Sequence, residues 1–212
     1  MHTPIKAVVL RYTCKATPSL SLYTPSHGRI TVRDGRRHGA RDPLHVGQII
    51  DGYLDQFGSS WQLQGAEHLM TQAPEASPES LYWQHHLLDI YYCYVPLEQP
   101  SGALFQLLSL CMRLGQAPPI VWKAAVVYLF SLLGYGVPKT LEECGKLLFR
   151  IDEHARTYNT ANVLHIDWQK EYACDEQTMN RWLIEVLQQH AHYSLLKTHY
   201  LFGQLYGTVG SP

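Results

Sequence analysis

The stretch "SLSLYTPSHGRITVR", residues 19–33, carries the pattern that decides the fold of the amino-terminal part of the chain. In its first six residues two leucines alternate with serines and Tyr23, as in a strand that buries one face. "PSHG" then places proline and glycine where a tight turn favours them. The last five residues alternate again, with apolar side chains on one face and Arg29 and Arg33 on the other. The stretch therefore predicts a pair of strands whose outer face is basic.

Three further segments have strand character, at 5–12, 46–57 and 60–69. In the last of them Trp61 alternates with Leu63, which predicts that Trp61 lies in the core. Five strands in fewer than 70 residues, joined mostly by tight turns, predict a small barrel, and the five-stranded oligonucleotide-binding (OB) fold is the best-known barrel of that size. Proline, serine and glutamate without periodicity at 71–80 predict a linker, and helical patterns follow it. We therefore predict an α+β chain: an OB-fold barrel at 1–70, a linker at 71–80 and an all-helical domain at 81–212.

The helical domain is predicted to hold long helices and shorter pieces, namely helices at 81–95 (capped by Ser77 or Ser80), 102–114, 118–136 and 175–193, a short helix near 140–148 and a last helix or docked segment at 193–207. The third helix is apolar on nearly all sides, which is typical of the centre of a helical bundle. It also contains Lys123, and Pro118 and Pro119 shorten it. We therefore predict a buried helix there and no membrane span.

Charge is unevenly distributed along the chain. The whole sequence has a formal net charge of −1, but residues 1–58 carry a net charge of +4 and residues 59–212 a net charge of −5. The five cysteines are scattered and odd in number, and the amino-terminal residues lack the pattern of a signal peptide. These features predict a cytoplasmic protein with reduced thiols, in which only the amino-terminal part addresses a polyanion.

The segment "RDGRRHGAR", residues 33–41, places four arginines in nine positions directly after a predicted strand. Guanidinium groups form paired hydrogen bonds with phosphate oxygens without reading a base sequence. The two glycines let the backbone approach a ligand closely. We predict a nucleic-acid-binding surface from its arginines together with the arginine that begins the preceding strand, and Tyr23 offers a stacking face for a base. The predicted contacts are Arg29, Arg33, Arg36, Arg37, Arg41 and Tyr23.

Catalytic and metal motifs do not emerge from the sequence. We find no Gly-x-Ser-x-Gly elbow, P-loop or Gly-x-Gly-x-x-Gly motif, and the histidine pairs at 84–86 and 190–192 point apart on helices. Cys144 and Cys174 each lack the close second cysteine of a structural zinc site, and His154 and His165 have irregular spacing. We therefore predict no catalytic residues, no cofactor and no metal. A hydrolase that uses the histidines would need a pocket where histidine, cysteine and an acid converge.

The order of these features resembles the RecO family of bacterial recombination mediators. The opening "AVVLRY … SLSLYTPSHGRITVRDGRRHGAR" is similar to the family's strand pair, turn and arginine-rich loop. "VWKAAVVYLFSLLGYGVPKTLEECG" resembles the family's apolar helix, and "YSLLKTHYLF" its closing segment. The family's zinc-binding members have two cysteine pairs, whereas this chain keeps one cysteine at each place, and members without zinc exist.

The resemblance implies a protein that is not an enzyme. Such a protein binds single- and double-stranded DNA, anneals complementary strands, and holds the acidic carboxy-terminal tail of single-strand-binding protein. With RecR as a possible partner it assists RecA loading in recombinational repair, in the cytoplasm and near the nucleoid. The barrel would carry the DNA contacts and the helical domain the pocket for the tail, with Lys123 meeting the tail's carboxylate. That lysine is alternatively a surface lysine whose stem lies along apolar neighbours.

A second hypothesis belongs to another class of function. The chain would be a protein-interaction adaptor that binds an acidic partner peptide and has little affinity for DNA. The low net charge of the whole chain favours it, and binding to a labelled oligonucleotide across a salt series separates the two hypotheses.

Overall fold

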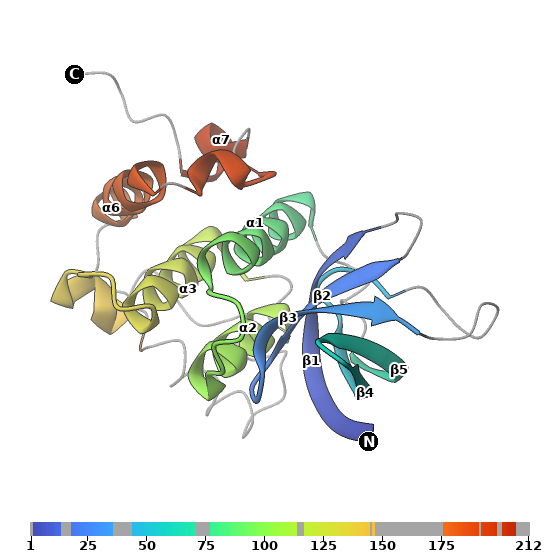
Figure 1. The fold of residues 1–212 in the computed structure, drawn as a ribbon. Coiled ribbons are helices and arrows are strands. Elements are labelled where there is room, and N and C mark those ends of the chain that lie inside the picture. The colour runs from blue at the N-terminus through green and yellow to red at the C-terminus, as the bar shows by residue number, and fades with distance from the viewer. Residues whose placement is uncertain are drawn as a thin grey trace, which may run out of the picture. The chain divides into compact units, whose positions relative to one another are not determined.

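The computed structural model describes residues 2–13, 18–35, 44–70, 77–113, 117–144, 146, 176–190, 192–198 and 201–206 (Figure 1). The chain divides into two compact units. The first comprises Met1–Pro74 and Leu88–Arg113, and the second comprises Glu75–Leu87 and Leu114–Pro212. This division differs from the predicted boundary at 71–80, because a helical segment groups with the barrel.

The first unit contains a closed five-stranded barrel with the strand order β1-β2-β3-β5-β4. All neighbouring strands pair antiparallel except β3 and β5, which pair parallel. The predicted fold class is confirmed: the chain is α+β, with an OB-like barrel followed by helices. The strands are β1 (His2–Thr13), β2 (Ser19–Thr24), β3 (Gly28–Asp34), β4 (Ile49–Phe57) and β5 (Ser60–Met70).

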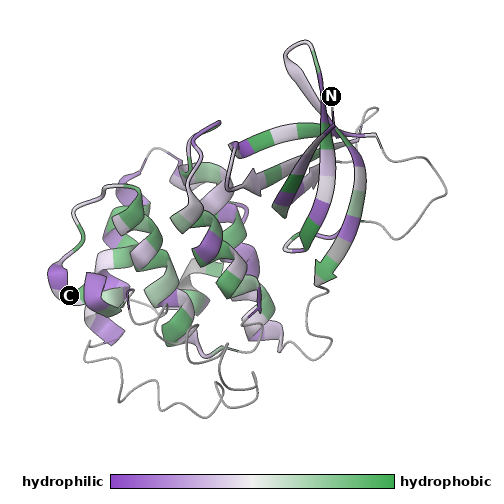
Figure 2. Cartoon of the chain, turned by 90° about the horizontal axis from the view of Figure 1, so that it is seen from below, coloured by the Kyte–Doolittle hydropathy of each residue, from purple (hydrophilic) through white to green (hydrophobic). Residues whose placement is uncertain are grey.

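Alternation along the strands fills the barrel, and Figure 2 shows apolar and polar residues succeeding one another along them. Leu20 and Leu22 pair across the sheet with Val32 and Ile30, and all four are buried in the barrel core. Trp61 packs partly against this core, as predicted. Apolar side chains on one face of each strand are therefore removed from water, which supplies the main stabilisation of the barrel.

The predicted turn between β2 and β3 is confirmed and is fixed by side-chain chemistry. The Oγ1 atom of Thr24 accepts a hydrogen bond of 2.9 Å from the backbone N–H of His27. Gly28 has a φ of 68°, a conformation that residues with a Cβ atom rarely adopt. A Cβ atom at this position would also lie 2.3 Å from the carbonyl oxygen of Gln99. Glycine is thus required twice, by the turn and by the segment packed against it.

Two helical segments complete the first unit. Helix α1 (Pro78–Tyr94) begins after Ser77, whose Oγ accepts a hydrogen bond of 3.2 Å from the N–H of Ser80 and caps the helix. Only its last turns, from Leu88, belong to the first unit. Helix α2 (Gly102–Arg113) follows, and the hydroxyl of Tyr91 donates a buried hydrogen bond of 2.9 Å to the carbonyl of Leu104. This bond ties the end of α1 to the start of α2.

The second unit is built around helix α3 (Pro119–Leu132), which begins with proline and is buried over most of its length, as predicted. Within the described residues, no helix combines the length and the apolarity needed to cross a membrane. This unit also contains the first turns of α1, up to Leu87, and its other helices include α6 (Glu176–Gln189), the 3₁₀ helix η2 (Tyr193–Leu195) and α7 (Phe202–Tyr206).

Candidate nucleic-acid interface

The outer face of β1, β2 and β3 combines guanidinium and hydroxyl groups. Arg11 of β1 lies in register with Ser21 of β2, which lies in register with Thr31 of β3. The next row contains Ser19 beside Arg33. Alternation directs these side chains away from the barrel core. Ser21 is buried, whereas Thr31 and Arg33 are exposed. The accessible part of this face thus presents a cation beside a hydroxyl donor, which suits phosphate oxygens.

Among the predicted contacts that the structure describes, Arg33 is the most accessible. It is exposed near the end of β3, and no described carboxylate forms an ion pair with it. Its neighbour Thr31 on the same face is also exposed. Because the guanidinium is exposed and has no carboxylate partner among the described residues, a phosphate can approach it without displacing one of them.

Arg29 lies on the same strand but is half-buried. Its guanidinium carbon lies 5.1 Å from the centre of the Tyr92 ring, and the guanidinium carbon of Arg11 lies 4.3 Å from the same ring. Burial lowers the pKa of Arg29, and its Nε atom is buried without a hydrogen-bond partner. The backbone carbonyl of Arg29 also accepts a hydrogen bond of 3.0 Å from the N–H of Glu98. Arg29 therefore helps to hold the α1–α2 connection, and only part of its side chain faces solvent.

The predicted stacking role of Tyr23 is wrong. The side chain is fully buried, at 0% exposure, and its ring packs edge-on against Tyr91 with 5.7 Å between the ring centres. Its hydroxyl donates a hydrogen bond of 3.5 Å to the carbonyl of Ser101, and burial raises its pKa to about 12. Tyr23 does point away from the barrel core, as the alternation predicts, but the end of α1 covers that side of β2. A base cannot reach it.

Sequence reasoning missed two residues of this surface, Arg11 and Tyr92. Arg11 follows a β-bulge between Val9 and Arg11, which resets the alternation of β1 and turns the arginine outward. No sequence signal marks the bulge. Tyr92 is one of three tyrosines in "YYCY" (residues 91–94), and no local signal distinguishes it as the one that contacts two arginines.

Three of the predicted contacts, Arg36, Arg37 and Arg41, fall outside the described residues. They follow Arg33 directly in the sequence, after the end of β3. Their role in nucleic-acid binding stays a prediction.

Lys123, which is predicted to meet a peptide carboxylate, already pairs with a carboxylate of this chain. Its ammonium is 2.5 Å from Oε1 of Glu176 at the start of α6, and it lies 5.8 Å from the centre of the Trp83 ring. The lysine side chain is 5% exposed and the glutamate side chain 49% exposed. The alternative of a surface lysine is therefore wrong. A partner's carboxylate would have to replace Glu176, and this role stays a prediction.

His86 of helix α1 faces the interior and has a structural role. His86 is fully buried, with its Nδ1 atom 2.8 Å from Oγ1 of Thr198 and its Nε2 atom 2.8 Å from the hydroxyl of Tyr206. Burial lowers its pKa to about 3, so the imidazole is neutral at physiological pH. Both ring nitrogens are engaged, which leaves neither for a metal or a reacting group.

Of the residues considered for a zinc site, the structure describes only Cys144. Cys144 is buried, and its thiol donates a hydrogen bond to the carbonyl of Thr140. Cys174, His154 and His165 lie outside the described residues. Among the described residues, no three histidine, cysteine or acidic side chains are grouped so that they could hold a metal ion.

The fold and this surface together define the class: an OB-like barrel with a partly basic outer face and associated helices. No protein-family model matches the chain, and the search of curated proteins found no match.

Proposed function

We propose that the protein is a DNA-binding and strand-annealing recombination mediator that binds single-strand-binding protein and assists RecA loading. It acts without catalysis, and RecR is a possible partner. The OB-like barrel supports this proposal, since closed barrels of this strand order commonly bind oligonucleotides. The resemblance to the RecO family adds the biological setting.

One observation carries the proposal. The outer face of β3 presents Arg33, exposed and unpaired among the described side chains, at the point where the chain enters the stretch with Arg36, Arg37 and Arg41. Strand β3 also carries the exposed Thr31 and the half-buried Arg29, and β1 adds the half-buried Arg11. Several guanidinium groups at one end of a barrel would neutralise successive phosphates of a strand.

The proposal is tested by fluorescence anisotropy with a labelled oligothymidine and the full chain. Arg33→Ala should weaken binding about three- to tenfold at low salt, because one phosphate contact is lost. Arg181→Ala is the matched control, since it removes the same charge from the exposed side of α6 in the second unit. An annealing assay with complementary strands should show the same ranking. Equal effects of the two variants would contradict the proposal.

The adaptor hypothesis has one observation in its favour. Lys123 is a buried cation whose carboxylate partner, Glu176, is half exposed, so a peptide carboxylate can compete for the same ammonium. In that case Glu176→Gln should strengthen binding of the acidic carboxy-terminal peptide of single-strand-binding protein. A chain that binds this peptide and shows no salt-dependent DNA binding would be an adaptor. Unchanged peptide binding in Glu176→Gln would remove Lys123 from the site.

A further inference from the structure

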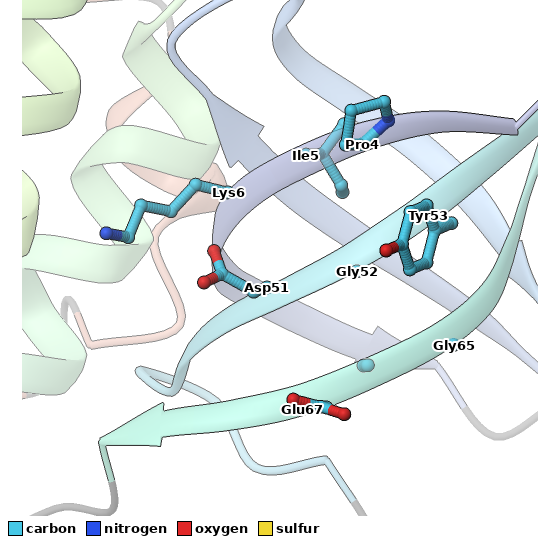
Figure 3. Close-up of a pocket in the computed structure, with 9 residues that line it drawn as sticks. Pro4, Ile5, Lys6, Asp51, Gly52, Tyr53, Gly65 and Glu67 are labelled. Carbon is cyan, nitrogen blue, oxygen red and sulfur yellow. The ribbon is translucent and has the colours of Figure 1, made fainter.

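A hollow of about 630 Å³ lies on the outer face of β1, β4 and β5, within the barrel unit. Figure 3 shows the side chains around it, with Asp51 and Tyr53 on β4, Lys6 on β1 and Glu67 on β5. This hollow is separate from the arginine-bearing face of β1, β2 and β3 described above.

The hollow exists because small residues meet across the two strands. Tyr53 lies in register with Gly65, and Gly52 lies in register with Ala66. A Cβ atom added at Gly65 would have no other atom within 4 Å, so the space above this glycine is open. The Tyr53 ring does not fill it, because the side chain is 54% exposed. An aromatic face is thus left accessible beside an unfilled space.

The charges around the hollow favour a cation. Asp51 lies in register with Lys6 on one side and with Glu67 on the other, which gives two carboxylates and one ammonium. None of the three side chains forms an ion pair or hydrogen bond with another described side chain. Neither β4 nor β5 contains a lysine or arginine. A phosphate strand is repelled by this face, whereas a positively charged group is attracted.

We propose that this hollow binds an arginine side chain from a segment of a partner protein. A guanidinium group stacks on an aromatic ring and forms forked hydrogen bonds with carboxylates, and the site offers both. Its planar head fits over Tyr53, its donors reach Asp51 and Glu67, and its aliphatic stem lies over Gly65. The inference goes beyond the proposed DNA binding and does not depend on it.

The test is a titration of the isotope-labelled full chain with acetyl-Gly-Arg-Gly-amide, followed by amide chemical shifts in two-dimensional NMR. The signals of Tyr53 and Gly65 should move with the arginine peptide and not with the same peptide carrying citrulline, its neutral analogue. Equal shifts with both peptides would overturn the proposal, because charge would then play no part.

Variants of the lining residues separate a binding role from a structural one. Gly65→Val should fold, because the added side chain enters open space, and it should abolish the shifts. Asp51→Asn with Glu67→Gln should weaken binding about tenfold. Lys6→Ala should strengthen binding about threefold, since it removes the competing cation. A folded Gly65→Val chain that binds the peptide with unchanged affinity would overturn the proposal.

Charge loss elsewhere on the chain and binding of DNA serve as controls. Glu185→Gln, an exposed carboxylate on α6, is the control for loss of one negative charge and should leave peptide binding unchanged. Oligonucleotide binding by Gly65→Val should equal that of the unmodified chain. Weakened DNA binding in Arg33→Ala with normal peptide binding would show that the two surfaces act independently.

Discussion

The buried imidazole of His86 makes the stability of the second unit depend on pH. The folded chain keeps this group neutral down to a pKa of about 3, against an ordinary value of 6.5. Below pH 6.5 the imidazole of His86 binds a proton in the unfolded chain but stays unprotonated in the folded chain. Stability is therefore fully present above pH 6.5 and is lost progressively as the pH falls towards 3. Thr198 and Tyr206, which hold both ring nitrogens, carry no charge that would offset this loss.

The size of the effect follows from the two pKa values. Each unit of pH below 6.5 costs about 1.4 kcal/mol until the folded group itself titrates, so that a change from neutral pH to about pH 5 removes about 2 kcal/mol. Other groups add their own dependence. The contribution of His86 is therefore the difference in pH dependence between the unmodified chain and His86→Gln, which cannot titrate.

Urea unfolding at neutral pH and at about pH 5, followed by tryptophan fluorescence, measures this difference. Trp83 packs edge-on against His86, with 6.0 Å between the ring centres, and reports on this region. His86→Gln should start less stable and lose about 2 kcal/mol less than the unmodified chain on acidification. His85→Gln changes an exposed histidine of the same helix and should follow the unmodified chain. Parallel pH dependence in His86→Gln and the unmodified chain would refute the reasoning.

Two further predictions concern packing and charge, and urea unfolding checks both. Gly28→Ala should lower the free energy of unfolding by at least about 3 kcal/mol, because φ is positive and the added Cβ atom would meet the Gln99 backbone. Gly58→Ala should lower it by about 1 kcal/mol, because φ is 59° there but the space around the added Cβ atom is open. Equal costs would show that the turn does not pack against Gln99. Glu176→Gln should lower the free energy of unfolding by about 1–3 kcal/mol, because it leaves the buried ammonium of Lys123 without its carboxylate partner. Lys123→Met removes the buried charge itself and should lower the free energy of unfolding by less. The reverse order would contradict the buried pair.

The barrel could be predicted closely because its strands alternate. The observed β2, Ser19–Thr24, has the predicted bounds, and the turn that ends at Gly28 follows from local residues. Alternation also assigned Tyr23 to the outer face correctly. It could not say what covers that face, since Tyr91 lies 68 positions further along the chain in a helix whose docking leaves no local signal. The predicted stacking site was lost for this reason.

The candidate sites were less predictable than the fold. Arg33 emerged from the sequence because a charged residue at an outward position of a strand needs no tertiary information. The sequence did not predict that Glu176 is the partner of Lys123, because the two residues are 53 positions apart and neither local pattern links them. The hollow beside Tyr53 likewise depends on its pairing with Gly65, which only the strand register reveals.

The measurement that tests the central claim most directly is the salt dependence of oligonucleotide binding by the full chain. If the basic face engages four or five phosphates, the logarithm of the binding constant should fall with the logarithm of salt concentration at a slope of about −3. Arg36→Ala with Arg37→Ala should reduce the steepness by about 1.4, for two lost contacts. A slope near zero, or one that these substitutions leave unchanged, would contradict the account.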